Sequence, residues 1–295
     1  MIITNKFNLP DPIVTAVSQD IYSKGASDIS ISELISPPRA RTLIERHKAD
    51  ITQDVSDLVW SLVGQIGHGI LQRSSALTAM SEKRLITNID GWRVSGQLDH
   101  YTYDSMKLVD WKFTTFWRLK DGVPEEWKEQ LNSYAYLLKC NDYPVSSAQI
   151  LAVYRDWSVS EAGRNPTYPQ KQVELFDVPL WPEELQLYFI RRRLELHKQA
   201  QDAPEELLPE CSPQERWQRR TIFQCIRQGN KKATKVFTNE SDAHKFVSSQ
   251  KVPSEFSIVR RLGEPIRCKH YCLAAPFCTQ WQKEKPLYEP LFSTI

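Results

Sequence analysis

The stretch LVDWKFT, residues 108–114, combines the β-branched and aromatic residues of a buried strand with two charged residues, Asp110 and Lys112. Side chains two positions apart in a strand point to the same face, so these two share a face while the apolar residues between them share the other. Taken alone the pattern is weak, because a solvent-exposed strand face also alternates in this way. The neighbouring sequence gives it more weight.

The preceding segment, GWRVSGQLDHYTY at residues 91–103, is also strand-like, and Asp104 and Ser105 predict a tight hairpin turn. With a two-residue turn, Asp99 faces Asp110 at a Cβ–Cβ distance of about 4.5–5.5 Å. Opposed carboxylates repel each other unless a cation joins them, and one or two carboxylates commonly hold Mg²⁺. The hairpin therefore predicts a divalent-metal site, provided that its register does not slip by one residue.

Helical and strand-like patterns alternate on both sides of the hairpin. We predict helices at 36–47, 54–74, 124–140 and 182–201, and further strands at 148–157 and 172–181. This mixture indicates an α/β (α+β) fold with a mixed central sheet flanked by helices.

The 295-residue chain is 41% hydrophobic and 25% charged, which is typical of a globular protein. Its net charge of +2 predicts no uniformly basic surface. The sequence becomes rich in proline and charge after about residue 203, so we predict one domain at 1–205 and a C-terminal extension at 206–295. The beginning of the chain lacks a secretory pattern, and no apolar run is long enough for a membrane span. We therefore expect a cytoplasmic protein that does not enter membranes.

A series of polar motifs surrounds the hairpin, across residues 60–140. In chain order they are His68 in GQIGHGIL, Glu82 in SEKRL, Asp99 in GQLD, Asp110 and Lys112 in VDWK, and Gln130 and Tyr134 in QLNSY. This order resembles the PD-(D/E)XK nuclease superfamily, specifically its RecB-like branch, which includes the AddB nuclease and the CRISPR adaptation nucleases. The flanking stretches LISPPR and LPECSPQERW resemble nuclease-like proteins of bacteriophages.

The resemblance implies a restriction-endonuclease-like core and a metal-dependent DNA nuclease. Asp99 and Asp110 would bind Mg²⁺ or Mn²⁺, helped by the backbone carbonyl of Trp111 and by His68 and Glu82. The metal would activate a water and stabilise charge on the phosphate.

Three further residues complete the catalytic set that the resemblance implies. Lys112 would position the water or neutralise the developing charge. Gln130 and Tyr134 share a helix face and would contact phosphate or orient the lysine. Structural alternatives stay open, because Tyr134 also belongs to an apolar helical stripe and His68 could be an ordinary helix histidine.

Three of the six cysteines lie together with C-x3-C-x5-C spacing: Cys268, Cys272 and Cys278. Three clustered thiolates and one distant cysteine fit a [4Fe–4S] cluster better than zinc, which favours closer pairs in two knuckles. Cys211 is the best candidate for the fourth ligand and Cys225 is the reserve, while Cys140 is expected in the core. Zinc or free thiols remain alternatives. In RecB-like relatives with such a cluster, the distant cysteine usually precedes the nuclease core. In this sequence all four candidate cysteines follow it.

Two basic clusters stand out, Arg191, Arg192 and Arg193 in the predicted helix at 182–201, and RQGNKKATK at 227–235. The arginines form either a solvated helix face or a groove that follows phosphates. The sequence contains no helix-turn-helix or zinc-finger signature, so we expect recognition of DNA ends or single strands rather than of sequence.

The resulting prediction is a Mg²⁺- or Mn²⁺-dependent deoxyribonuclease, an exonuclease acting in recombination, replication or end processing. Recombination or replication proteins are its expected partners, and the cytoplasm of a bacterium or of a phage-infected host is its expected location. The rival interpretations are a non-cleaving iron–sulfur DNA-binding or adaptor protein, and a structural partner in a recombination complex.

Overall fold

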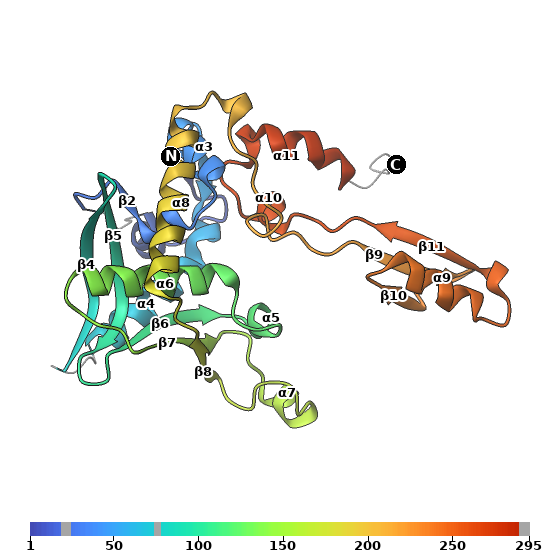
Figure 1. The fold of residues 1–295 in the computed structure, drawn as a ribbon. Helices are drawn as coiled ribbons and strands as arrows, with labels where there is room; N and C mark the ends of the chain where they lie inside the picture. Colours follow the sequence, from blue (N-terminus) through green and yellow to red (C-terminus); the bar gives the residue numbers. More distant parts are fainter. Residues whose placement is uncertain (19–24, 74–77, 289–295) are drawn as a thin grey trace. The chain divides into compact units, whose positions relative to one another are not determined.

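The computed structural model describes residues 1–18, 25–73 and 78–288, which belong to two compact units (Figure 1). The first unit contains residues 1–36 and 49–201, and the second contains residues 37–48 and 202–295. The prediction placed the boundary at residue 205 and assigned residues 37–48 to the N-terminal domain. The structure instead joins this short segment to the C-terminal unit, through contacts that no local pattern indicates.

A six-stranded mixed sheet forms the centre of the first unit, so the predicted fold class is confirmed. Its strands are β2 (Ile29–Ser30), β4 (Ala79–Ile89), β5 (Trp92–Thr102), β6 (Lys107–Thr114), β7 (Ser147–Tyr154) and β8 (Val173–Val178). The order is β2-β5-β6-β7-β8, and β4 also pairs with β5. The β6–β7 and β2–β5 pairs are parallel and the others are antiparallel.

The hairpin between β5 and β6 has the predicted register, since His100 pairs with Val109 and Thr102 pairs with Lys107. Asp104 and Ser105 lie at the centre of the turn. The Met106 N–H closes the turn by donating to the Tyr103 carbonyl at 3.3 Å. The register that brings the two aspartates together is therefore confirmed.

Helices α2 (Ile31–Leu34), α4 (Val55–Arg73) and α6 (Glu125–Cys140) contact the strands of this sheet, and the first unit buries a large apolar core. The other helices of the unit are α1 (Asp11–Ser18), which contacts α4, α5 (Phe116–Leu119), α7 (Val159–Arg164) and α8 (Glu183–Asp202). The predicted helices at 124–140 and 182–201 are thus confirmed. The helix at 54–74 is confirmed up to residue 73, and residue 74 lies outside the described residues.

Two close approaches position α4 and α6 on the strands of the site. A Cβ atom added to Gly96 in β5 would lie 2.7 Å from Tyr134 Cε1 of α6, and one added to Gly67 in α4 would lie 2.0 Å from Phe113 Cζ of β6. Only the absence of a side chain at these glycines allows such contacts.

The remaining strands of the first unit, β1 (Ile2–Thr4) and β3 (Thr52–Asp54), form a two-stranded parallel sheet. Cys140, which was expected in the core, is exposed at the end of α6, so that expectation was wrong. The last turn of the helix carries it beyond the buried stripe. Among the described helices, none is long and apolar enough to cross a membrane.

The second unit has more regular structure than its sequence suggested. Its elements are α3 (Pro38–Arg46), β9 (Ile222–Arg227), β10 (Lys235–Phe237), α9 (Glu240–Ser248), β11 (Phe256–Arg261), α10 (Ile266–His270) and α11 (Thr279–Glu284). The strands form an antiparallel sheet in the order β10-β9-β11. This sheet was not predicted, because its strands are short and charged residues interrupt them.

Candidate active site

Three carboxylates lie side by side on three adjacent strands of the first unit. The residue pairs on either side of Glu82 in β4 place it opposite Asp99 in β5. Continuing the β5–β6 register by one residue places Asp99 opposite Asp110. Glu82 has a φ of 51°, a left-handed conformation that is costly for a residue with a side chain. Glu82 nevertheless lies within β4 rather than in a turn.

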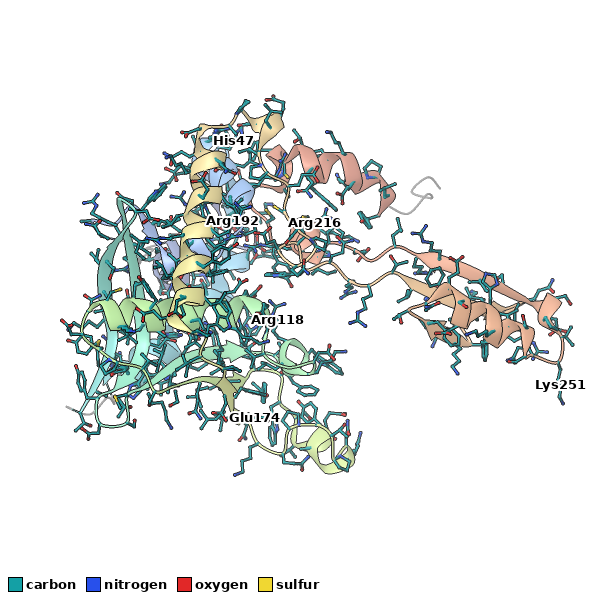
Figure 2. The ribbon with its side chains drawn as sticks, in the orientation of Figure 1. His47, Arg118, Glu174, Arg192, Arg216 and Lys251 are labelled. Carbon is teal, nitrogen blue, oxygen red and sulfur yellow. The ribbon has the colours of Figure 1, made fainter. Side chains whose placement is uncertain are left out.

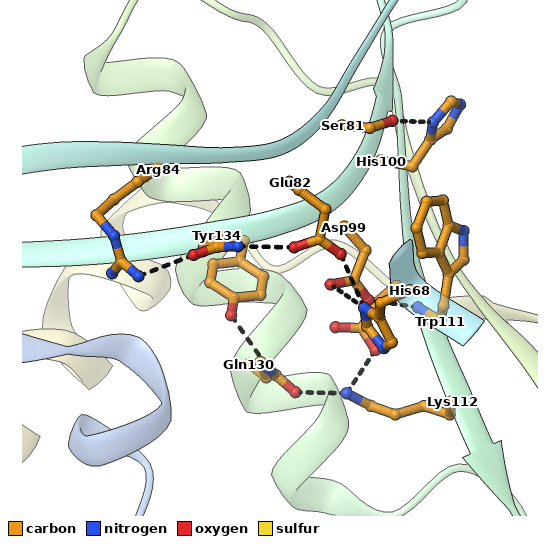
Figure 3. Close-up of polar contacts among 12 residues, drawn as sticks. His68, Ser81, Glu82, Arg84, Asp99, His100, Trp111, Lys112, Gln130 and Tyr134 are labelled. Carbon is orange, nitrogen blue, oxygen red and sulfur yellow. Dashed lines mark hydrogen bonds and ion pairs between the residues drawn. The ribbon is translucent and has the colours of Figure 1, made fainter. Parts of the chain in front are cut away.

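His68 of α4 completes the acidic cluster (Figure 3). Its Nδ1 atom lies 2.9 Å from Glu82 Oε1 and 3.4 Å from Asp99 Oδ1. One potential ligand atom from each of these three residues lies within 4.8 Å of the others. The carboxylates suit Mg²⁺ or Mn²⁺ and the imidazole adds a nitrogen donor of the kind that transition metals take, so the arrangement can hold a divalent cation.

The buried carboxylates of Asp99 and Asp110 have few hydrogen-bond donors around them, so their oxygens could bind a cation. Burial, followed by the nearby Asp110 charge, raises the pKa of Asp99 to about 8. Asp99 accepts one hydrogen bond, at 2.6 Å, from the backbone N–H of Trp111. Asp110 Oδ2 is buried and has an ion-pair contact with Lys112, but no hydrogen bond of suitable geometry within the described residues. A divalent ion would compensate this concentration of negative charge.

The pKa shifts of His68 and Glu82 are also compatible with a site at which a cation displaces a proton. Burial disfavours the His68 cation, but the hydrogen bond to Glu82 and the charges of Asp99, Glu82 and Asp110 outweigh it and raise the pKa of His68. Burial would raise the pKa of Glu82, yet hydrogen bonds from His68 and Gln97 lower it overall. Because a ligating histidine must be neutral, metal binding would release the His68 proton.

Lys112 connects the carboxylates to α6. Its Nζ atom lies 2.6 Å from Asp110 Oδ2 and donates to Gln130 Oε1 at 3.0 Å. Gln130 Nε2 then donates to the Tyr134 hydroxyl at 3.1 Å. Burial opposes the lysine's charge, but Asp110 and Asp99 outweigh it and raise the pKa of Lys112. Lys112 is therefore an ammonium group, suited to neutralising charge rather than to accepting a proton.

The interpretations of Tyr134 as a core residue and as a site residue are both compatible with this structure. Its ring is buried with 5% exposure and packs in the main apolar core, while its hydroxyl reaches Gln130. Trp111 contacts the site through its backbone N–H and through its ring, whose centroid lies 5.6 Å from that of His68, and the proposed role of its carbonyl stays a prediction.

Two residues that support the site were missed in the sequence. Gln97 Nε2 donates to Glu82 Oε2 at 2.7 Å, and Arg84 donates to Gln97 Oε1 at 2.8 Å and to Ser95 Oγ at 3.2 Å. Arg84 is two residues after Glu82 in β4, so the alternation of strand side chains could have indicated it.

The cysteine cluster lies in the second unit, where the predicted thiols come together. Burial, followed by Glu215 and by the charges of Cys278, Cys268 and Cys272, raises the pKa of Cys211 to about 12. Burial and Cys272 similarly raise the pKa of Cys268 to about 11. The reserve candidate Cys225 is buried separately in the β9 core, where its sulfur contacts the Ala243 carbonyl.

Gln280 and Arg39, which are far apart in the sequence, form hydrogen bonds with the segments that contain Cys211 and Cys278. Gln280 exchanges two hydrogen bonds with the backbone of Cys211, at 2.9 and 3.1 Å. Arg39 of α3 is 3% exposed and donates from Nε to Cys278 Sγ at 3.3 Å. Its other nitrogens donate to the Leu208 carbonyl at 2.6 Å and to the Thr279 hydroxyl. Arg39 was not predicted, because 239 residues separate it from Cys278.

Two of the three arginines of α8 make contacts within the first unit. Arg191 pairs with Asp90 at 2.9 Å. Arg193 donates to the Leu34 carbonyl at 2.9 Å and to the Ser36 carbonyl at 2.5 Å, so its guanidinium holds backbone groups near the end of α2. Arg192 is exposed. Arg193 therefore has a structural role in the first unit, and the nucleic-acid role expected of the three arginines stays a prediction.

Comparisons with known proteins give limited information. No family model matches the chain, and no curated protein matches it. Solved structures similar to it include the crystal structure of SSO0001, which is 15% identical, with 70% of this chain and 87% of that chain covered and a TM-score of 0.46. The functional assignment therefore depends on the geometry of the site.

Proposed function

We propose that this protein is a Mg²⁺- or Mn²⁺-dependent deoxyribonuclease that hydrolyses phosphodiester bonds. The observation that carries the proposal is the row of Glu82, Asp99 and Asp110 across three strands, with His68 beside it and the Lys112 ammonium at one end. A divalent cation would replace the protons of Asp99 and His68 and offset the charge of the carboxylates, and it would also offset the charge that a phosphate group adds beside them.

The residues divide into ligands and groups that act on the substrate. Glu82, Asp99, Asp110 and His68 would hold the metal, which when bound supplies a water of lowered pKa and stabilises charge on the phosphate. Lys112 would hold the attacking water or neutralise the oxygen on which charge develops. Gln130 fixes the Lys112 ammonium from the side of α6, and Tyr134 fixes Gln130 in turn.

We further propose that Cys211, Cys268, Cys272 and Cys278 hold a structural [4Fe–4S] cluster. The C-x3-C-x5-C spacing of three of these cysteines, with the fourth further away in the sequence, supports this centre over the paired knuckles of a zinc site. Zinc is the alternative.

Within this proposal the substrate is DNA, taken at ends or as single strands without reading of sequence. An exonuclease in recombination, replication or end processing fits this description. We place it in the cytoplasm of a bacterium or of a phage-infected host, working with recombination or replication proteins.

Cleavage assays test the nuclease proposal directly. Wild-type protein should degrade labelled single-stranded and blunt linear DNA with Mg²⁺ or Mn²⁺, spare circular DNA, and stop when EDTA is added. Lys112→Ala should reduce the rate on the order of 100-fold or more, because a donor to the developing charge is removed. Lys120→Ala, at an exposed lysine just after α5, is the control and should retain full activity.

The outcome also separates the rival interpretations. Undiminished cleavage by a folded Lys112→Ala protein would remove Lys112 from the mechanism. A wild-type protein that binds DNA and contains iron and sulfide, yet cleaves no substrate with either metal, would instead be the non-cleaving iron–sulfur DNA-binding protein.

A further inference from the structure

The second unit contains a small folded segment, residues 218–265, which we call the arm. Its ends meet in an antiparallel bridge between Gln218 and Pro265, and the Arg219 N–H donates to the Glu264 carbonyl at 3.0 Å. Between these ends lie β9, β10, β11 and α9, which make up a sheet with one helix (Figure 1). Neither the candidate active site nor the four proposed cluster ligands use any residue of the arm.

Only one face of the arm's sheet is packed. Cross-strand partners point to the same face, so the register sorts the side chains. Cys225 and its partner Ile258 lie on the face that packs with Ala243 and Phe246 of α9. Gln224 and its partners Val236 and Val259 lie on the other face, where the two valines are 47% and 38% exposed. This second face is open to solvent.

The arm also concentrates the positive charge of the protein. It contains ten Lys and Arg residues and four Asp and Glu residues, which gives a net charge of +6. Because the whole chain carries +2, the remaining residues carry −4. The nearly balanced total therefore hides a strongly basic segment within an acidic remainder.

Most of these cations have no carboxylate partner among the described residues. Within the arm, Arg227 pairs with Glu255 at 2.8 Å and Lys245 lies 3.6 Å from Asp242. Of the other eight, Arg219 lies near enough to Glu264 to lower the pKa of that carboxyl, and Lys235 lies over the Phe237 and Phe246 rings. The remaining six are exposed and form no ion pair with any described residue: Arg220, Lys231, Lys232, Lys251, Arg260 and Arg261. Lys251 lies at the tip of the arm, beside the connection from α9 to β11 (Figure 2). Their charge is thus available to an external anion.

We propose that the arm binds the sugar–phosphate backbone of a nucleic acid, independently of base sequence. A polyanion matches several unpaired cations on one small module, and its binding gains free energy by releasing condensed counterions. The described side chains on the open face are aliphatic or polar, so stacking on aromatic rings does not supply this affinity. The choice of DNA as the polymer rests on the proposed nuclease function, whereas the charge argument does not.

Fluorescence anisotropy with full-length protein tests the proposal. The probes are fluorescein-labelled DNA oligonucleotides of two unrelated sequences, single-stranded and duplex, titrated in EDTA at several NaCl concentrations. Two double variants remove charge, Lys231→Gln with Lys232→Gln and Arg260→Gln with Arg261→Gln. The matched control is Lys171→Gln with Lys198→Gln, at two exposed lysines of the first unit.

Each arm variant should raise Kd equally for both sequences, and the control should not. For every phosphate that the variant no longer neutralises, the slope of log Kd against log salt should fall by about 0.7 with single strands and by about 0.9 with duplexes. Circular dichroism should show that all variants are folded, because the altered side chains are exposed.

Two results would overturn the inference. The first is that both arm variants have the same Kd and the same salt slope as the control variant. The second is weaker binding in Val236→Ser with Val259→Ser, at an unchanged salt slope, while the charge variants bind normally. That result would assign DNA binding to apolar contacts of the open face rather than to the charge of the arm.

The test is separable from that of the nuclease proposal, because EDTA removes the metal on which cleavage depends. If wild-type protein cleaves DNA normally but the arm variants bind DNA as the control does, only the proposal of DNA binding by the arm is rejected. If the arm variants bind DNA more weakly but wild-type protein cleaves no DNA, only the nuclease proposal is rejected.

Discussion

Asp99 is the residue at which protons and metal compete most directly. Its pKa of about 8 in the folded protein lies far above the value of about 4 in an unfolded chain. The folded state therefore binds more protons between these values, and the contribution of Asp99 to the free energy of unfolding falls as the pH rises from about 4 to about 8. A bound cation would replace the proton and remove this loss.

This competition predicts a pH-dependent stabilisation by metal. The increase in Tm on adding Mn²⁺ should be larger near pH 8 than near pH 6, because fewer protons must be displaced and a ligand that binds only the folded state stabilises it. Differential scanning fluorimetry at both values measures the effect. Asp99→Asn should abolish the increase and Asp104→Asn, at the exposed turn, should preserve it. An equal increase in both variants would contradict the assignment of Asp99 as a ligand.

The residues of the site were predictable to different degrees. Asp99, Asp110 and Lys112 could be placed because a short turn and strict strand alternation fix which side chains face each other. Glu82 was less certain because its left-handed φ is not a property that its sequence neighbours reveal. Gln97 and Arg84 act through Glu82, and nothing in their own residue types distinguishes them from ordinary polar strand residues.

At the scale of elements, the close packing of α6 on β5 connects the fold to the chemistry. Tyr134 contacts Gly96 with its ring and Gln130 with its hydroxyl, and Gln130 holds Lys112. A displacement of this ring would therefore be transmitted to the ammonium group at the site.

Gly96→Ala tests this connection. The new methyl group would lie 2.7 Å from a buried ring, so we expect a loss of stability of about 1–3 kcal/mol and a lower kcat for DNA cleavage. Urea unfolding and steady-state kinetics measure the two effects. Gly163→Ala, in the exposed helix α7 with no atom within 4 Å of the added carbon, is the control. If Gly96→Ala matches the control in both assays, the contact does not position Lys112.

Elements with a strong period were predictable, whereas elements that depend on distant partners were not. The helices at 124–140 and 182–201 were indicated by apolar residues at helical spacing. β4 carries charged residues on both sides of its alternation, and β9–β11 are short strands that depend on one another. Such strands are specified by tertiary pairing more than by local composition.

At the scale of the whole molecule, residues 37–48 belong to a unit whose other residues begin at Asp202. Arg39 makes this association specific, since its guanidinium donates to a thiol, a carbonyl and a hydroxyl of the C-terminal segment. No sequence period links two segments so far apart, which is why the division of the chain was only partly predictable.

Arg39→Gln should weaken the second unit. Unpaired buried acceptors cost about 1–3 kcal/mol, so we expect lower stability of this unit and faster loss of the proposed [4Fe–4S] cluster to a chelator. Iron and sulfide content after timed exposure to a chelator measures the second effect. Lys48→Gln, at an exposed residue of the same segment, is the control and should behave as wild type. Equal retention in both variants would show that Arg39 does not support the cysteine site.

The division of the second unit also sets an order of events during protein synthesis. Residues 49–201 separate α3 from the rest of its unit, so the ribosome adds 153 residues before the first of α3's partners exists. At typical rates of about 5–20 residues per second, this takes roughly 8–30 seconds. By the end of that interval the strands that carry the carboxylates have been synthesised, whereas the residues that pack against α3 have not. The first unit can therefore bring its three carboxylates together before Cys211, Cys268, Cys272 and Cys278 of the second unit have been synthesised.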